Sequence, residues 1–243
     1  MKVIVVIPTY NEASNLPSLL DALWALPVPG LRALVVDDGS PDGTGRLADE
    51  RAAQAPERLE VLHRRGPRGL GLAYVDGFRR ALDRGADLLV QMDADFSHSP
   101  ADVPKLLAGL DNADLVIGSR YVPGGSVDDN WGFGRGTLSR SANALARSVL
   151  SLKTHDATAG FRAWRRQALE AIDPGRITSN GYLFQVEMVF LSEKIGLRIV
   201  EAPIYFAERR VGRSKMSLKV KLEAALGLFR IRRQHRAVRP RSR

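Results

Sequence analysis

Apolar runs of strand length that stop at polar motifs constrain this 243-residue chain more than any other feature of its sequence. The run at 3–7 consists only of valine and isoleucine, and mainly apolar runs follow at 33–36, 59–62, 88–92 and 115–117. Stretches with apolar residues at helical spacing separate these runs. Uninterrupted β-branched runs are typical of parallel strands that are buried on both faces. The alternation of short strands and helices therefore predicts a doubly wound α/β fold with a mostly parallel sheet.

Carboxylates follow three of these expected strands. Asp93 and Asp95 come directly after the fourth run. Asp37 and Asp38 end the second run, and Glu12 follows the first. Because ligands bind beyond the carboxyl ends of parallel strands, we expect all five groups at one edge of the sheet. Neighbouring carboxylates repel one another unless a hard cation lies between them, so the Asp-x-Asp motif predicts a Mg²⁺ or Mn²⁺ site, although alone it would more often be a solvated turn.

Several common catalytic motifs are absent from the chain. There is no cysteine, which excludes disulfides, thiolate metal sites and cysteine nucleophiles. The sequence also lacks a P-loop, an H-E-x-x-H motif and a G-x-S-x-G motif. Gly66, Gly69 and Gly71 follow the third expected strand and lack the G-x-G-x-x-G spacing, so a nicotinamide-dinucleotide site has little support.

The alternating pattern changes after Tyr121. Residues 122–136 are rich in glycine and aspartate and predict a long loop, of the kind that forms lids or binding segments. Beyond this loop we expect a helix at 138–149, a second helix at 181–194 and a strand at 197–206.

The basic character of the chain is concentrated at its C-terminal end. Residues 209–243 contain 13 Lys or Arg and one acid, whereas residues 1–208 contain 23 basic and 26 acidic residues. An amphipathic helix is expected over about 218–232, and its apolar face would consist of Leu218, Leu222, Ala225, Leu226 and Phe229. Residues 235–243 are too polar to pack, and we expect them to be disordered.

Three roles are open for this basic segment: a solvated tail, a helix on an anionic membrane surface, or a nucleic-acid-binding arm.

The chain has no apolar stretch of about 20 residues that could span a bilayer. Its first apolar run is too short for a signal peptide. We therefore expect an intracellular protein that has no membrane span.

Taken together, the polar motifs resemble those of a known enzyme family. They are Pro8-Thr9-Tyr10-Asn11-Glu12, Val36-Asp37-Asp38-Gly39-Ser40-Pro41-Asp42-Gly43-Thr44, Asp93-Ala94-Asp95, Ser119-Arg120-Tyr121, Arg135 with Ser139-Arg140, Gly160-Phe161-Arg162 and Arg209-x-x-Gly212-x-Ser214-Lys215. Their order and spacing resemble family-2 glycosyltransferases of GT-A fold. Among these they are most similar to polyprenol (dolichol) phosphate mannose synthases of the catalytic type without C-terminal membrane spans. The resemblance covers about residues 3–215.

The resemblance implies a GT-A (Rossmann-like) catalytic domain over residues 1–215. Residues 216–234 would form a basic amphipathic helix, packed on the domain or lying at the membrane surface, and 235–243 would form the disordered tail. The resemblance also implies a metal cofactor, Mg²⁺ or Mn²⁺.

The resemblance implies a role for each matching residue. Asp95 and Arg120 would be catalytic. The nucleotide sugar would contact Pro8, Tyr10, Glu12, Val36, Asp37, Asp38, Asp93, Ala94, Asp95, Arg120, Arg209 and Lys215. The lipid phosphate would contact Arg120, Arg135 and Ser139. The metal would be held by Asp95, Asp93 and Ser97, where some members of the family have glutamine in place of Ser97.

The implied reaction is metal-dependent, inverting transfer of mannose from GDP-mannose to polyprenyl phosphate. The protein would bind peripherally to the cytoplasmic face of a membrane, and the resemblance leaves open whether a membrane-embedded partner protein is required. A phosphate monoester, whose second pKa is about 6, is already an anionic nucleophile at neutral pH, so no strong general base is assigned.

Two alternatives stay open at this point. The donor could be another sugar nucleotide such as UDP-glucose. The chain could instead bind nucleic acid through its basic end, but its aromatic residues are not interleaved with the basic run, so we expect no nucleic-acid partner.

Overall fold

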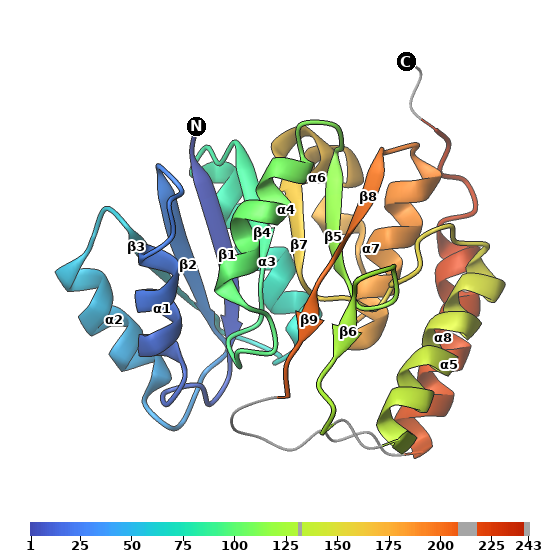
Figure 1. Ribbon diagram of the computed structural model, residues 1–243, viewed down its shortest axis with the longest axis horizontal. Coiled ribbons are helices and arrows are strands. Elements are labelled where there is room, and N and C mark those ends of the chain that lie inside the picture. The colour runs from blue at the N-terminus through green and yellow to red at the C-terminus, as the bar shows by residue number, and fades with distance from the viewer. Residues whose placement is uncertain (131–132, 209–217, 241–243) are drawn as a thin grey trace.

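A computed structural model of the chain describes residues 1–130, 133–208 and 218–240, without the side chains of residues 133, 135 and 218–224. In this part of the chain, seven strands form one twisted sheet with helices on both faces (Figure 1). The sheet order is β3-β2-β1-β4-β7-β5-β8. The strands are β1 (Val3–Thr9), β2 (Leu31–Asp37), β3 (Leu59–His63), β4 (Leu88–Gln91), β5 (Leu115–Ser119), β7 (Arg162–Arg165) and β8 (Ile199–Pro203).

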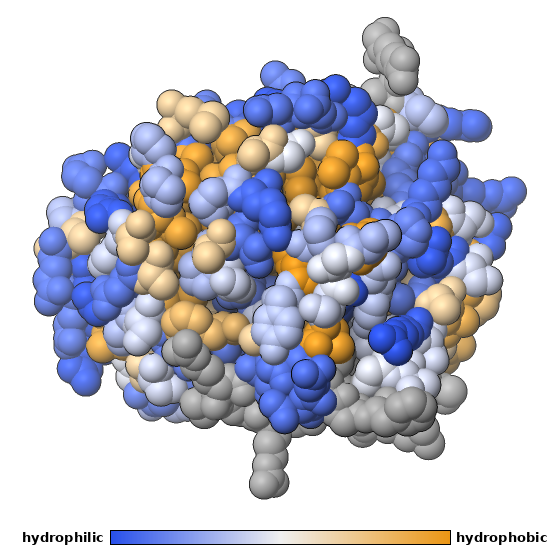
Figure 2. Space-filling view, in the orientation of Figure 1, coloured by the Kyte–Doolittle hydropathy of each residue, from blue (hydrophilic) through white to orange (hydrophobic). Residues whose placement is uncertain are grey.

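The helices bury two separate cores against the sheet. The α-helices are α1 (Leu16–Trp24), α2 (Thr44–Gln54), α3 (Leu70–Asp83), α4 (Val103–Gly109), α5 (Phe133–Leu150), α6 (Arg166–Ile172), α7 (Tyr182–Lys194) and α8 (Leu218–Gln234), and the 3₁₀ turns are η1 (Pro100–Asp102) and η2 (Pro174–Arg176). Residues of α1, α2 and α4 pack on one face, whereas α3, α5, α6, α7 and α8 contribute to the core on the other. Figure 2 shows the first of these faces, with hydrophilic residues gathered over α2 and hydrophobic patches nearer the middle.

The two cores follow from the alternation of side chains along each strand. Val5 and Ile7 of β1 belong to the core under α1, and Val6 belongs to the core under α3. β1 pairs in parallel with both β2 and β4. The chain adds β2 and β3 on one side of β1 and then places β4 on its other side, so the strand order reverses between β1 and β4. Such a switch point is where a doubly wound sheet opens a crevice for ligands. The expected doubly wound, mostly parallel sheet is confirmed.

One strand of this sheet was not predicted. β7 runs antiparallel between β4 and β5. It is four residues long and carries an arginine at each end, so its sequence has no strand-like apolar pattern. Arg162 is nevertheless fully buried, and its Nη2 donates to the carbonyl groups of Ala157 and Gln185 at 3.1 and 3.0 Å.

Two expected segments need correction. Residues 122–136 are not one long loop, because β6 (Ser126–Val127) lies within them and α5 begins at Phe133. The single strand expected at 197–206 is divided into β8 and β9 (Tyr205–Phe206). β9 leaves the main sheet and pairs with β6, which ties the two segments together.

The expected apolar face of the C-terminal helix is also wrong in its described half. Leu226 and Phe229 of α8 are 64% and 59% exposed, whereas Leu228 and Ile231 are buried. Gly227 permits this packing, since a Cβ there would lie 2.2 Å from Leu183 Cδ1 of α7. α8 has apolar residues on more than one side, and the close approach to α7 decides which side is buried.

The C-terminal residues pack further than expected. His235 is 4% exposed, and Val238 packs against the core, so the prediction of disorder is wrong for these two residues. Among the helices that the structure describes, none combines the length and the apolar character needed to cross a membrane.

Candidate active site

A pocket of about 190 Å³ lies at the carboxyl ends of the strands beside the switch point. Its lining consists of Pro8, Thr9, Tyr10, Glu12, Asp38, Leu70, Ala73, Asp93, Ala94 and Asp95. Seven of the predicted nucleotide-sugar residues therefore come together here. Val36 does not line the pocket and is buried in the core under α3. A larger cavity lies elsewhere, between α5, α7 and α8.

The loop after β2 holds the loop after β1 in place. Asp37 accepts hydrogen bonds from Thr9 Oγ1 at 3.1 Å and from Ser40 Oγ at 2.6 Å. The backbone N–H of Asn11 donates to Ser40 Oγ at 3.1 Å, and that of Glu12 donates to Thr44 Oγ1 at 2.9 Å. In this arrangement Asp37 contacts the protein rather than lining the pocket. Its predicted contact with the nucleotide remains a prediction.

Asp38 lies in the pocket with its charge compensated. One of its oxygens accepts from the backbone N–H of Gly69 at 2.7 Å, and the other pairs with Arg64. Arg64 also donates through Nε to Asp76 at 2.7 Å. These contacts fix the direction of the Asp38 carboxylate, which can then accept a hydrogen bond from a ligand. Sequence reasoning missed Arg64, whose only signal is its position directly after β3.

Buried partners fix the direction of Asp93. Tyr74 Oη donates to Asp93 Oδ1 at 2.8 Å, and the backbone N–H of Asp93 donates to His98 Nδ1 at 3.1 Å. Burial, and next the charge of Asp93, raise the pKa of Tyr74 well above its ordinary value, so Tyr74 stays a donor. His98 is itself buried and stacks on Phe161 with ring centroids 4.9 Å apart. Neither Tyr74 nor His98 was predicted.

Asp95 is held by the residues that follow it. Its Oδ1 accepts from the backbone N–H of Ser97 at 3.0 Å and from the Ser97 hydroxyl. Phe96, between them, has a φ of 61°, in the left-handed region that bulky residues rarely adopt. Such strain is characteristic of functional sites. Ser97, predicted as a metal ligand, is buried and orients the carboxylate of Asp95, and its metal contact remains a prediction.

The acidic pair suits a hard divalent cation. The described residues contain no group of three or more His, Cys, Asp or Glu that could hold a metal by themselves. Mg²⁺ and Mn²⁺, however, commonly take one or two carboxylates and complete their shell with water and substrate phosphates. Gly160 leaves room beside the pair, because a Cβ there would lie 3.4 Å from Asp93 Oδ2. The residues present therefore fit a cation that is shared with a diphosphate.

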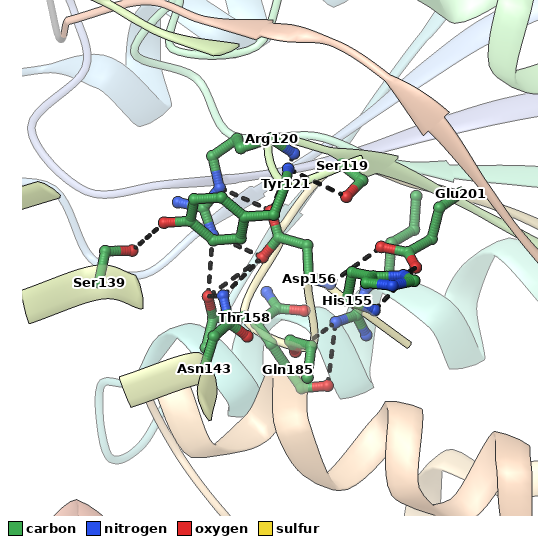
Figure 3. A network of polar contacts seen from close by, with 12 residues as sticks. Ser119, Arg120, Tyr121, Ser139, Asn143, His155, Asp156, Thr158, Gln185 and Glu201 are labelled. Carbon is green, nitrogen blue, oxygen red and sulfur yellow. Dashed lines mark hydrogen bonds and ion pairs between the residues drawn. The ribbon is translucent and has the colours of Figure 1, made fainter. Parts of the chain in front are cut away.

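Arg120, at the end of β5, belongs to a second polar network (Figure 3). Its Nε and Nη2 each donate to a different oxygen of Asp156, both at 2.7 Å, and Nη2 also donates to Thr158 Oγ1 at 2.8 Å. Asn143 of α5 donates to Asp156 at 3.1 Å. Burial alone would raise the pKa of Asp156, but the charge and hydrogen bonds of Arg120 hold it below its ordinary value. Asp156 was not predicted to have a role.

Ser139 lies near this network through an aromatic link. Tyr121 Oη donates to Ser139 Oγ at 2.7 Å, and the Arg120 guanidinium lies 5.0 Å from the Tyr121 ring centroid. Two of the three predicted lipid-phosphate residues are thus brought together. Arg135 lies in the first turn of α5, and its side chain falls outside the described part. Arg209 and Lys215 fall outside the described residues altogether.

The doubly wound sheet and the acidic pair at its switch point define the class of the protein, a glycosyltransferase of GT-A fold. A family model described as glycosyl transferase family 2 matches residues 4–173, and the chain belongs to this family. The expected enzyme class is confirmed.

Two relatives resemble the chain over most of its length. A polyprenol monophosphomannose synthase of Mycolicibacterium smegmatis is 50% identical over 217 residues, which cover 89% of this chain and 81% of that protein. An undecaprenyl-phosphate mannosyltransferase of Micrococcus luteus is 50% identical over 230 residues, which cover 95% and 93%. Among solved structures, glucosyl-3-phosphoglycerate synthase from Mycobacterium tuberculosis has a TM-score of 0.63 at 21% identity, covering 99% of this chain and 81% of that one. That likeness concerns the fold alone.

Proposed function

We propose that this glycosyltransferase transfers mannose from GDP-mannose to a polyprenyl phosphate, with inversion and with Mg²⁺ or Mn²⁺ as cofactor. The observation that carries the proposal is the 50% identity, over 89% and 95% of the chain, to two proteins whose names specify mannosyl transfer to a polyprenyl phosphate. The geometry of the acidic pocket agrees with such a donor.

The donor would lie in the pocket beside the switch point. Tyr10 is partly exposed with Arg68 over its ring at 4.8 Å, and it offers a flat surface to a base. Glu12 and Asp38 would accept hydrogen bonds from the guanosine. Asp93 and Asp95 would hold the cation, which would neutralise charge on the leaving diphosphate. Arg209 and Lys215 would contact the same diphosphate.

The acceptor phosphate would lie near Arg120, Ser139 and Arg135. An anionic phosphate needs positioning by arginine more than it needs a base. Asp156 holds the plane of the Arg120 guanidinium through two hydrogen bonds, so Arg120 would meet the phosphate in a fixed orientation.

A cavity that shares no lining residue with the donor pocket supports the proposal that the protein binds peripherally to the cytoplasmic face of a membrane. It measures about 590 Å³, and it is lined by Leu150, Ser151, Phe190, Lys194, Phe229, Arg232, Arg233 and Arg236. Four cations beside apolar side chains suit an anionic lipid surface, where each basic residue contributes about 1 kcal/mol.

Sedimentation with phosphatidylglycerol vesicles tests this surface. Arg233→Glu should lower the sedimented fraction about fivefold or more, whereas Arg46→Glu, at an exposed position of α2, should not. Equal sedimentation of the two variants would refute this surface. A membrane-embedded partner protein remains a prediction.

Transfer of labelled sugar tests the proposed reaction. The protein is incubated with a short polyprenyl phosphate and either GDP-mannose or UDP-glucose, with Mg²⁺, with Mn²⁺ or with chelator. We expect a mannosylated lipid only with GDP-mannose and metal. A product from UDP-glucose alone would overturn the donor, and the absence of any lipid product would overturn the acceptor.

A further inference from the structure

The loop at residues 178–181 is clamped against the first turn of α3. Asn180 Oδ1 accepts hydrogen bonds from the backbone N–H groups of Gly71 at 2.9 Å and Gly181 at 2.8 Å. A Cβ at Gly69 would lie 2.1 Å from Asn180 Nδ2, and one at Gly71 would lie 2.8 Å from the Ser179 carbonyl oxygen. Both glycines are therefore needed for the loop to reach the backbone of this turn.

The same turn of α3 forms a wall of the donor pocket. The backbone N–H of Gly69 donates to Asp38 Oδ2 at 2.7 Å, and Leu70 and Ala73 line the pocket together with Asp38. A shift of the loop would therefore move the turn, and with it the position of Asp38. This is a contiguous path of contacts from the loop to the predicted guanosine site.

The other side of the loop is held from the C-terminal end of the chain. Glu187, fully buried on α7, accepts from the backbone N–H of Ser179 at 2.8 Å and contacts His235 Nε2 at 2.6 Å. Burial alone would raise the pKa of Glu187, but hydrogen bonds from His235 and Ser179 hold it below its ordinary value. A carboxylate only accepts hydrogen bonds, so His235 Nε2 is the donor. Beside this pair, Thr178 Oγ1 donates to Gln234 Oε1 at 2.9 Å.

We infer that His235 and Glu187 are positioning residues for the nucleotide-sugar donor. His235, directly after α8, fixes Glu187, and Glu187 fixes the loop at 178–181. The loop in turn fixes the first turn of α3, where the Gly69 N–H holds Asp38. The loop at 178–181, Glu187 and His235 all lie beyond residue 173, where the family match ends. The inference rests on the proposed function for the identity of the donor. The path of contacts from His235 to Asp38 does not depend on that function.

His235→Ala, His235→Gln and the control Arg239→Ala test this inference. Arg239 is exposed and lies four residues further along. We expect His235→Ala to weaken GDP binding in calorimetry and to raise the KM for GDP-mannose about tenfold, the size expected for loss of a buried charged hydrogen bond. The KM for polyprenyl phosphate should change less than about twofold. Glutamine can donate to Glu187, so His235→Gln should recover most of the affinity.

Amide hydrogen exchange provides a readout that does not depend on activity. The N–H groups of Gly69 and Gly71 should exchange faster in His235→Ala than in wild type, and Arg239→Ala should match wild type. A variant with a lower melting temperature but unchanged exchange at these two glycines and unchanged GDP affinity would overturn the inference. Wild-type protein that binds no GDP would refute the proposed function instead, and faster exchange at the two glycines would then still support the path.

Discussion

Loss of the charge on Asp156 should destabilise the protein strongly. Asp156→Asn keeps the shape of the side chain but leaves the buried guanidinium of Arg120 without its counter-charge. Asp156 is fully buried, and its two hydrogen bonds from the Arg120 guanidinium measure 2.7 Å each. Removal of one partner from such a pair costs about 3–5 kcal/mol. The amide oxygen still accepts one hydrogen bond and Thr158 remains in place, so we expect the lower end, about 3 kcal/mol.

Urea unfolding at pH 7, followed by circular dichroism, measures this loss of unfolding free energy directly. For a chain of this size the loss corresponds to a fall in melting temperature of about 6–12 °C. The double variant Arg120→Met with Asp156→Leu removes both charges and should be more stable than Asp156→Asn, because no unpaired buried charge remains. A loss below about 1 kcal/mol in Asp156→Asn, or a double variant that is less stable than the single one, would refute the reasoning.

The stability difference between wild type and Asp156→Asn should depend on pH, and the direction of this dependence follows from the pKa of Asp156. The folded-state pKa of Asp156 lies below its ordinary value of 3.8. Its stabilising contribution is therefore complete above the unfolded-state pKa and is lost as the pH falls through the folded-state pKa. The difference in unfolding free energy between wild type and Asp156→Asn should be constant from about pH 5 to 8 and should shrink below about pH 4.

Two further predictions concern Tyr74 and α8. Tyr74→Phe removes the donor to Asp93, and we expect initial-rate assays to show kcat lowered about tenfold, with unfolding free energy lowered by about 1 kcal/mol. An unchanged kcat would show that Tyr74 does not orient Asp93. Leu228→Ala should lower the unfolding free energy by about 2–4 kcal/mol, because Leu228 is buried. Leu226 lies two residues away on an exposed side of α8, so Leu226→Ala should change the unfolding free energy by less than about 0.5 kcal/mol. Equal losses in the two variants would contradict the orientation of α8.

Local patterns predicted those elements whose environment is uniform. β1, β2 and β4 are buried on both faces, so their apolar runs alone identify them. β7 escaped prediction because its burial depends on pairing with two strands that are distant in sequence. The orientation of α8 was mispredicted for a similar reason, since several of its faces are apolar and only contact with α7 distinguishes them.

The candidate site likewise contains residues that the local sequence predicted and partners that it did not. Asp38, Asp93 and Asp95 were predicted because each lies at the end of an apolar run. Their supports were missed, because Tyr74 lies 19 residues from Asp93 and Arg64 lies 26 residues from Asp38. Such partners meet only in the folded chain, and nothing in the local sequence around them marks the contact.

The role of the acidic pair is the central claim, and mannose transfer by Asp95→Asn tests it most directly. The assay uses GDP-mannose, a short polyprenyl phosphate and saturating Mn²⁺, with Asp111→Asn, an exposed aspartate after α4, as the matched control. We predict that Asp95→Asn lowers kcat about 1,000-fold, because charge on the leaving diphosphate is no longer stabilised, while Asp111→Asn retains wild-type activity. Transfer by Asp95→Asn within about tenfold of wild type would contradict the account.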